Sequence, residues 1–304
     1  PTMAINTSSS LVDAMTAEVM AAEYEMLLGA QGDFLQHPAL IYKQCPAGST
    51  TLKIPYLGLG GHDLLTAGTE GSELAATTIQ DDSATVTVAW YGKRYAVTEI
   101  ARMSTPAGML SPELFALDAA KSRAQTLVSL IAALGSGFSQ SVETSGVNLT
   151  FAKFREAVDV LTVNQVKGPY LAVLHDQQWA DLGADLGNLP RAAIEDPGVR
   201  GAVVAGMGTY KGRLFGVDVF TSPHIPTANA GADRAGIIFG RGAVCWSDKE
   251  ILPDANPNIV NLGGRAKFEI ERKGSFDMNN YITHAYMGVS EGLDAAGVSL
   301  ITDA

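Results

Sequence analysis

Histidine is the side chain that most often does acid–base or metal chemistry near neutral pH, so its placement is the first test for an active site. None of the histidines lies in an HExxH pattern or at ligand spacing from a Cys or Glu. His175 alone stands beside a carboxylate, that of Asp176, and adjacent residues rarely form a catalytic pair. Asp176 is better explained as the N-cap of a helix. The five histidines are His37, His62, His175, His224 and His284.

Glycine-rich and serine-containing stretches also fail the patterns that chemistry requires. Gly135-Ser136-Gly137 has the wrong spacing for a nucleophile elbow and follows a helix where that motif needs a strand. The stretch 206–211 contains two glycines and a lysine but lacks GK[ST], and no helix follows 58–61. Asp81 and Asp82 are read as solvated loop charges. We therefore expect no catalytic, cofactor-binding or metal-binding residues and predict that the chain is not an enzyme.

Composition sets further bounds on function. The 304 residues are 46% hydrophobic and 17% charged, which is enough to bury a large core. The net charge of −11 argues against binding nucleic acid through its phosphates, although it permits a protein that encloses nucleic acid. Cys45 and Cys245 have no neighbours at metal or redox spacing, so we expect two reduced, buried thiols. No secretion signal or membrane-spanning stretch is visible.

An amphipathic helix is predicted over residues 8–28. Its apolar residues recur at spacings of three and four, which places them on one face. Two interpretations stay open: a helix that packs on its own core, or one that packs on another molecule. The stripe consists of Val12, Met15, Val19, Ala22 and Met26.

Residues 46–100 combine strand patterns with a long acidic excursion. Val86, Val88 and Trp90 alternate as one face of a strand, and the basic pair Lys93 and Arg94 follows. From 58 to 83 there is no periodicity, and loops of this length are uncommon inside compact domains. We predict a strand pair with an arm that reaches away from its own core; a lid over an enzyme site is the alternative. The arm's acidic residues include Asp63, Glu70 and Glu73.

The remaining elements mix helices and strands without a βαβ rhythm, which predicts an α+β fold. The strongest helix runs from Ser111 to Gly135, with Pro112 at its first position. Further helices are expected after Thr150 and from Asp176, the latter carrying Trp179 and Leu182. Strands are predicted at 170–174, 212–222, 235–240, 265–273 and 280–289.

Three segments together resemble the tailed-bacteriophage major capsid protein, the Hong Kong ninety-seven-type capsid fold. They are PYLAVLHDQQWADL at 169–182, GRLFGVDVFTSP at 212–223 and IIFGRGAV at 237–244. Their order resembles that of the family's axial domain and of the return to its peripheral domain. The resemblance implies an N-terminal arm at 1–45, an extended β-hairpin loop at 46–105, a peripheral domain with a long spine helix at 106–164 and 251–304, and an axial domain at 165–250.

That resemblance implies a structural function. The chain would self-assemble as pentamers and hexamers into the icosahedral head shell of a virion, formed in the bacterial host cytoplasm. It would enclose phage DNA without reading its sequence, and its other partners would be portal, scaffolding and cement proteins, with no membrane and no cofactor. A scaffolding segment, which some members carry, would be separate or already removed.

Contacts between subunits are expected at the leading helix, the acidic arm and the strand that follows. The alternatives are an encapsulin-like nanocompartment shell protein, another virion protein, and a soluble α+β enzyme with a lid loop. The expected contact residues are Val12, Met15, Val19, Met26, Asp63, Glu70, Glu73, Trp90, Lys93 and Arg94.

Overall fold

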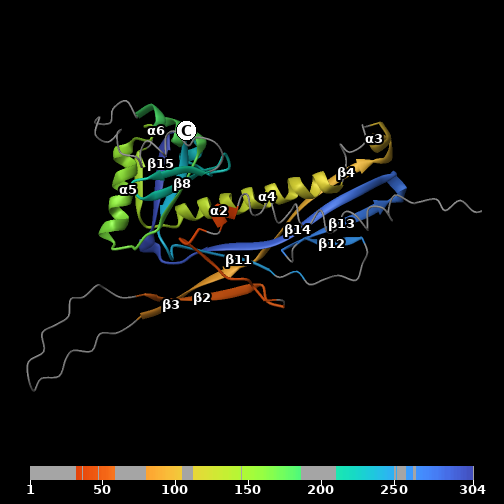
Figure 1. The fold of residues 1–304 in the computed structure, drawn as a ribbon, viewed down its shortest axis with the longest axis horizontal. Coiled ribbons are helices and arrows are strands. Elements are labelled where there is room, and N and C mark those ends of the chain that lie inside the picture. Colours follow the sequence, from red (N-terminus) through yellow and green to blue (C-terminus); the bar gives the residue numbers. More distant parts are fainter. Residues whose placement is uncertain are drawn as a thin grey trace, which may run out of the picture.

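The computed structural model contains two β-sheets, a separate two-stranded ribbon and one long helix that joins them (Figure 1). It describes residues 32–35, 37–46, 48–58, 80–104, 112–144, 146–185, 210–249, 251, 258–262 and 265–303. The predicted helix at 8–28 and most of the acidic excursion therefore lie outside the described residues.

The first sheet has six strands around the long strand β14 (Met278–Glu291). β4 (Ala89–Thr98) pairs with β14 from Met278↔Thr98 to Met287↔Ala89, and β13 (Ala266–Lys273) pairs with it from Lys273↔Met278 to Ala266↔Ala285. β13 and β14 match the strands predicted at 265–273 and 280–289. The other strands are β1 (Leu40–Tyr42), β11 (Val244–Asp248) and β12 (Ile259–Leu262).

The second sheet has seven strands and is buried on both faces. β6 (Tyr170–Leu174) and β10 (Asp233–Phe239) lie at its centre, and their residues are almost continuously apolar because both faces are covered. The outer strands are β5 (Ser141–Thr144), β15 (Gly297–Asp303), β7 (Tyr210–Leu214), β8 (Val217–Thr221) and β9 (Thr227–Ala228).

One face of the second sheet is covered by α5 (Phe151–Val163) and α6 (Asp176–Asp185), and the other faces α4 (Pro112–Ala133). As predicted, Thr150 caps α5: its side chain accepts a hydrogen bond from the backbone N–H of Lys153. The N-cap interactions of α6 are made by His175, whereas the sequence had assigned them to Asp176. The backbone N–H of Gln177 donates to His175 Nδ1 at 3.1 Å.

The helix α4 links the two sheets, as expected of the predicted helix at 111–135. Its 22 residues rise about 33 Å along the axis. Ala116 and Ala120 pack on the first sheet, whereas Leu127 and Ile131 belong to a core shared with β6, β10, β11 and β14. Both ends of the helix are therefore held by different sheets. Short helical segments are α2 (Gly32–Leu35), α3 (Glu99–Ser104), η1 (Leu134–Ser136), η3 (Asn229–Gly231), η4 (Gly274–Phe276) and η5 (Asp294–Ala296).

Two strand predictions are corrected. The single strand expected at 212–222 is the hairpin β7–β8, because Phe215 and Gly216 have positive φ values of 49° and 81° and form a tight turn. The strand face of Val86, Val88 and Trp90 is broken after Val88, where the chain passes from the ribbon to the first sheet. Trp90 is consequently 62% exposed, while both valines are buried.

The sheets do not follow the domain ranges inferred from the sequence. β5 and β15 pair with each other and β15 pairs with β10, so residues 141–144 and 297–303 lie in the second sheet. β11 lies in the first sheet, paired with β1 and β14.

Candidate assembly interface

The ribbon projects from the molecule beyond its attachment to the first sheet (Figure 1). β2 (Thr51–Gly58) and β3 (Gln80–Thr87) are paired throughout, from Thr51↔Thr87 to Gly58↔Gln80. At its base, one face of the ribbon is buried through Ile54, Ala84 and Val86, which pack with Cys245 of β11. The opposite face of this base is solvent-exposed and consists of Thr51, Lys53, Pro55, Ser83, Thr85 and Thr87.

One face of the first sheet is covered by α4. Phe115 of the helix stacks between Tyr95 and Tyr281, with ring centroids 4.8 Å and 5.0 Å away. Lys93 lies on this same face and binds Asp118 and Ser122 of α4. Hydrogen bonds from Lys93 and Tyr95 lower the pKa of Asp118 below its ordinary value, against the opposing effect of burial. The Lys93 ammonium is therefore engaged within its own chain.

The opposite face of the first sheet presents polar and aromatic side chains. Trp90 stacks on His284 with ring centroids 5.7 Å apart, and its indole N–H donates to His284 Nδ1 at 3.1 Å. His284 Nε2 lies 3.2 Å from Glu269 Oε2. Exposed Arg94 donates through Nε to Asn280 Oδ1 at 3.2 Å. We call the side chains of Trp90, Arg94, Glu269 and His284 the open face, whereas Asn280 is itself fully buried.

A buried ion pair fixes α4 against β11. Arg123 Nη2 lies 3.1 Å from Asp248 Oδ2, and the two side chains are 3% and 0% exposed. The Tyr42 hydroxyl donates to the other carboxylate oxygen at 2.6 Å, and Arg265 stacks over the Tyr42 ring at 5.8 Å. Burial and the neighbouring carboxylate raise the pKa of Tyr42, so its hydroxyl remains a donor. This cluster joins β1, β11 and α4.

Neither the described clusters nor the cysteines form a recognisable reaction centre. Among the described residues there is no group of three or more His, Cys, Asp or Glu side chains that could hold a metal ion. Cys45 and Cys245 are free and buried, and burial raises the pKa of the Cys245 thiol to about 11. Of the helices that the structure describes, none is long and apolar enough to cross a membrane.

A family model for phage capsid proteins matches residues 81–298, well over half of the chain. The chain belongs to the phage capsid protein family. It is thus a structural protein of the phage head shell and part of the virion. A search of curated proteins found no match.

Solved capsid structures share this fold at low sequence identity. The capsid of Ralstonia phage GP4 superimposes with a TM-score of 0.58 at 11% identity, covering 88% of this chain and 87% of that one. The capsid of cyanophage P-SCSP1u gives 0.57 at 13%, covering 87% and 86%. The SrpI encapsulin of Synechococcus elongatus PCC 7942 gives 0.57 at 13%, covering 90% and 88%. The α+β fold is accordingly the tailed-phage major capsid fold.

The structure separates the residues that the sequence nominated for capsid contacts. Trp90 and Arg94 lie on the open face, and Lys93 lies on the face covered by α4. The other seven, Val12, Met15, Val19, Met26, Asp63, Glu70 and Glu73, lie outside the described residues. Sequence reasoning missed the cluster of Arg123 and Asp248. The feature of the sequence that could have revealed this cluster is Arg123, a charged residue among the apolar positions of α4 between Ala120 and Leu127.

Proposed function

We propose that this capsid protein is the major subunit of the head shell and that copies hold one another through the ribbon and the open face. The observation that carries the proposal is the ribbon itself. A lone two-stranded hairpin is marginally stable in water, and its exposed strand edges invite pairing with another chain. Among the ribbon residues whose side chains the structure describes, those that pack on its own chain lie at the base and include Ile54, Ala84 and Val86.

The open face is the second proposed contact. Trp90, His284 and Glu269 already hydrogen-bond one another within the chain, whereas Arg94 donates, within the described part of the chain, only to the neutral amide of Asn280, so a neighbour that covers this face would need to supply a carboxylate for Arg94. Trp90 supplies an exposed aromatic anchor, a residue type enriched at interface centres. Lasting interfaces of this kind typically bury about 2,000–5,000 Å². The contact residues predicted in the leading segment and in the acidic arm complete the proposed set.

We also propose that each of the two sheets forms the centre of one domain of the subunit. The second sheet with α5 and α6 corresponds to the axial domain, and the first sheet with α4 corresponds to the peripheral domain. On this division, residues 141–163 and 297–303 belong to the axial domain and β11 to the peripheral domain.

The proposed partners follow from the shell. Copies associate as pentamers and hexamers in the host cytoplasm, around DNA that is held without sequence-specific contacts. Portal, scaffolding and cement proteins are the other expected partners, and we propose no catalytic role.

Purification followed by negative-stain imaging and limited digestion with endoproteinase Glu-C tests this proposal. Glu-C can cut at Glu18, Glu23 and Glu25 in the leading segment and at Glu70 and Glu73 in the acidic arm. We expect fast cleavage in unassembled subunits and strong protection in shells. A protein that remains a small species and is equally protected at these sites would refute the proposal.

An encapsulin-like shell is the second candidate, because the SrpI encapsulin matches as well as the phage capsids do. Gene neighbourhood distinguishes the two: portal and terminase genes beside this gene are expected for a phage head and not for a cellular compartment.

A further inference from the structure

A polar cavity of about 180 Å³ lies between α4 and the covered face of the first sheet. Of the described residues that line it, the charged ones are Lys93 of β4 and Arg123 of α4, and both are cations. The cavity is several times larger than the roughly 10–15 Å³ that a single water needs. Its other polar lining comes from Tyr91, Ser122, Thr126 and Thr283.

Two buried polar atoms of residues that line this cavity have no hydrogen-bond partner within the described part of the chain. They are Nε of Arg123 and Oγ1 of Thr283, and both residues are nearly fully buried. Buried polar groups are almost always hydrogen-bonded, because an unpaired one loses its hydration without a return. A ligand that offers several oxygen acceptors would satisfy both atoms.

The charges around the cavity favour an anion over a neutral ligand. Arg123 pairs with Asp248, and Arg265 lies near the same carboxylate. Lys93 pairs with Asp118. Three cations therefore face two carboxylates, and neither carboxylate belongs to a residue that lines the cavity. Because the Lys93 side chain is 44% exposed and that of Arg123 is 3% exposed, the two lining cations mark an outer and an inner end.

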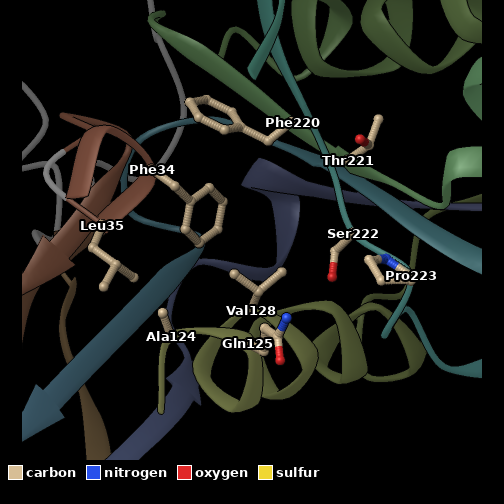
Figure 2. A pocket seen from close by; sticks show the side chains of 9 residues that line it. All are labelled: Phe34, Leu35, Ala124, Gln125, Val128, Phe220, Thr221, Ser222 and Pro223. Carbon is tan, nitrogen blue, oxygen red and sulfur yellow. The ribbon is translucent and has the colours of Figure 1, made fainter. Parts of the chain in front are cut away.

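Another hollow against α4 has a different character (Figure 2). It lies between α2, α4 and the end of β8, where Phe34 and Val128 contribute to its lining, and none of the residues that line it is charged. An ion placed there would lose its hydration and gain no counter-charge. An anion is therefore expected in the polar cavity and not in this apolar one.

We propose that the polar cavity binds a small oxyanion such as inorganic phosphate. The Nε–H of Arg123 and the hydroxyl of Thr283 donate to its oxygens, and the Lys93 ammonium lies at the entrance. Hydrogen bonds from cationic donors to phosphate oxygens are among the strongest in proteins. Since Arg123 belongs to α4 and Thr283 to β14, the bound anion ties the helix to the sheet. The inference does not depend on shell formation.

Thermal melting of unassembled subunits in phosphate or in chloride, at pH 7 and equal ionic strength, tests the site. At a phosphate concentration about tenfold above Kd, we expect the Tm to rise by about 2–4 °C relative to chloride. Thr283→Val keeps the shape of the side chain but removes its hydroxyl, so most of this rise should disappear. The matched control is Thr162→Val on the exposed side of α5, which should retain the rise.

A second variant fills the cavity and leaves its polar groups in place. Ala119→Met extends a flexible apolar side chain from α4 into the space, and it should also remove the rise caused by phosphate. Ala152→Met on the exposed side of α5 is its control. Melting in chloride alone shows whether each variant folds, and the two controls measure the general stabilisation that phosphate gives to any protein.

The outcomes decide between the sources of the phosphate group. A short DNA strand without terminal phosphates, at the same phosphate concentration, should give no rise that depends on the cavity. A rise with DNA that Ala119→Met removes would assign the cavity to nucleic acid and overturn the small-anion proposal. The absence of a rise in the wild type, or rises of equal size in Thr283→Val and Thr162→Val, would overturn it as well.

Discussion

Asp248 is a fully buried carboxylate on which three polar side chains converge. Its carboxylate meets the Arg123 guanidinium and the Tyr42 hydroxyl, and Arg265 lies 3.7 Å away at the rim. A buried ion pair contributes little net stability, because desolvation opposes the attraction, but removing one partner leaves an uncompensated charge. The cluster therefore acts as a constraint on how α4 sits against β11.

We expect Asp248→Ala to destabilise the subunit by about 3–5 kcal/mol, because Arg123 stays buried without its counter-charge. Urea unfolding followed by tryptophan fluorescence measures this change. Asp159→Ala is the control: Asp159 pairs with Arg155 at 3.8 Å on α5, but their side chains are 65% and 69% exposed. That variant should unfold with the wild-type midpoint. Equal losses of unfolding free energy in the two variants would contradict the expected penalty for leaving Arg123 buried without a counter-charge.

His175 makes one helix terminus sensitive to pH. Its Nδ1 accepts the N–H of Gln177, while its own backbone N–H donates to Gln178 Oε1 at 3.0 Å. Burial and Arg234 lower the pKa of His175 below the ordinary 6.5, partly offset by Asp176 and the Pro223 carbonyl. The unfolded chain therefore takes up this proton more readily than the folded one, and stability must fall as the pH drops below about 6.5.

We expect His175→Asn to weaken this pH dependence between pH 7 and 5, because Asn can cap a helix and does not titrate there. Chemical unfolding of the subunit at several pH values measures how the free energy of unfolding changes with pH. A wild-type slope retained in the variant would mean that another group causes the acid sensitivity.

At the scale of elements, glycine decides how closely the ribbon approaches the first sheet. A Cβ on Gly288 of β14 would lie 2.2 Å from the backbone oxygen of Thr87, at the end of β3. A side chain here would push the ribbon off the sheet, because backbone atoms on both sides cannot rotate away. The ribbon's direction thus depends on a residue far away in sequence.

Gly288→Ala should cost about 1–3 kcal/mol and loosen the ribbon, as overpacking of a tight contact does. Amide hydrogen exchange should show reduced protection of β2 and β3, and shell yield should fall. Gly183→Ala on α6 is the matched control, because a Cβ there meets nothing within 4 Å and alanine favours a helix. Unchanged exchange in the ribbon of Gly288→Ala would contradict the close approach.

At the scale of the whole molecule, the two sheets are parts of one cooperative unit. Leu127 and Ile131 of α4 pack in a core that includes Phe239 of the second sheet and Trp246 of the first. The chain also passes from one sheet to the other between β10 and β11 and again between β14 and β15. Displacing one sheet would therefore disturb the packing of the other.

The net charge of −11 makes copies of the subunit repel one another at long range. We expect the critical concentration for assembly to fall as salt rises from about 0.02 to 0.2 M, because the Debye length shortens from roughly 20 Å to 7 Å. Light scattering at a series of protein concentrations measures it. A critical concentration that rises with salt would mean that attractive ion pairs across the interface outweigh the overall repulsion.

The sequence predicted elements wherever local pattern and tertiary packing agree. α4 and α5 carry apolar stripes and N-terminal residues that suit a helix start, and Phe154, Leu161, Leu127 and Ile131 are all buried as their spacing implied. β13 alternates because α4 covers only one face of the first sheet. Prediction failed at Trp90 and at Phe215-Gly216, where a change of partner or a tight turn interrupts a pattern that reads as one strand.

By itself, the sequence determined the class of fold and the long helix, because these depend on periodicity and capping along the chain. The expectation of a shell protein came from the resemblance of three segments to a known family. The tertiary structure alone decided that Lys93 turns inward while Arg94 stays on the open face, that Arg123 meets Asp248, and that β5 and β15 join the second sheet. Neighbouring residues of a strand point to opposite faces, and pairings over more than a hundred residues leave no local pattern. Only the packed chain brings such groups together.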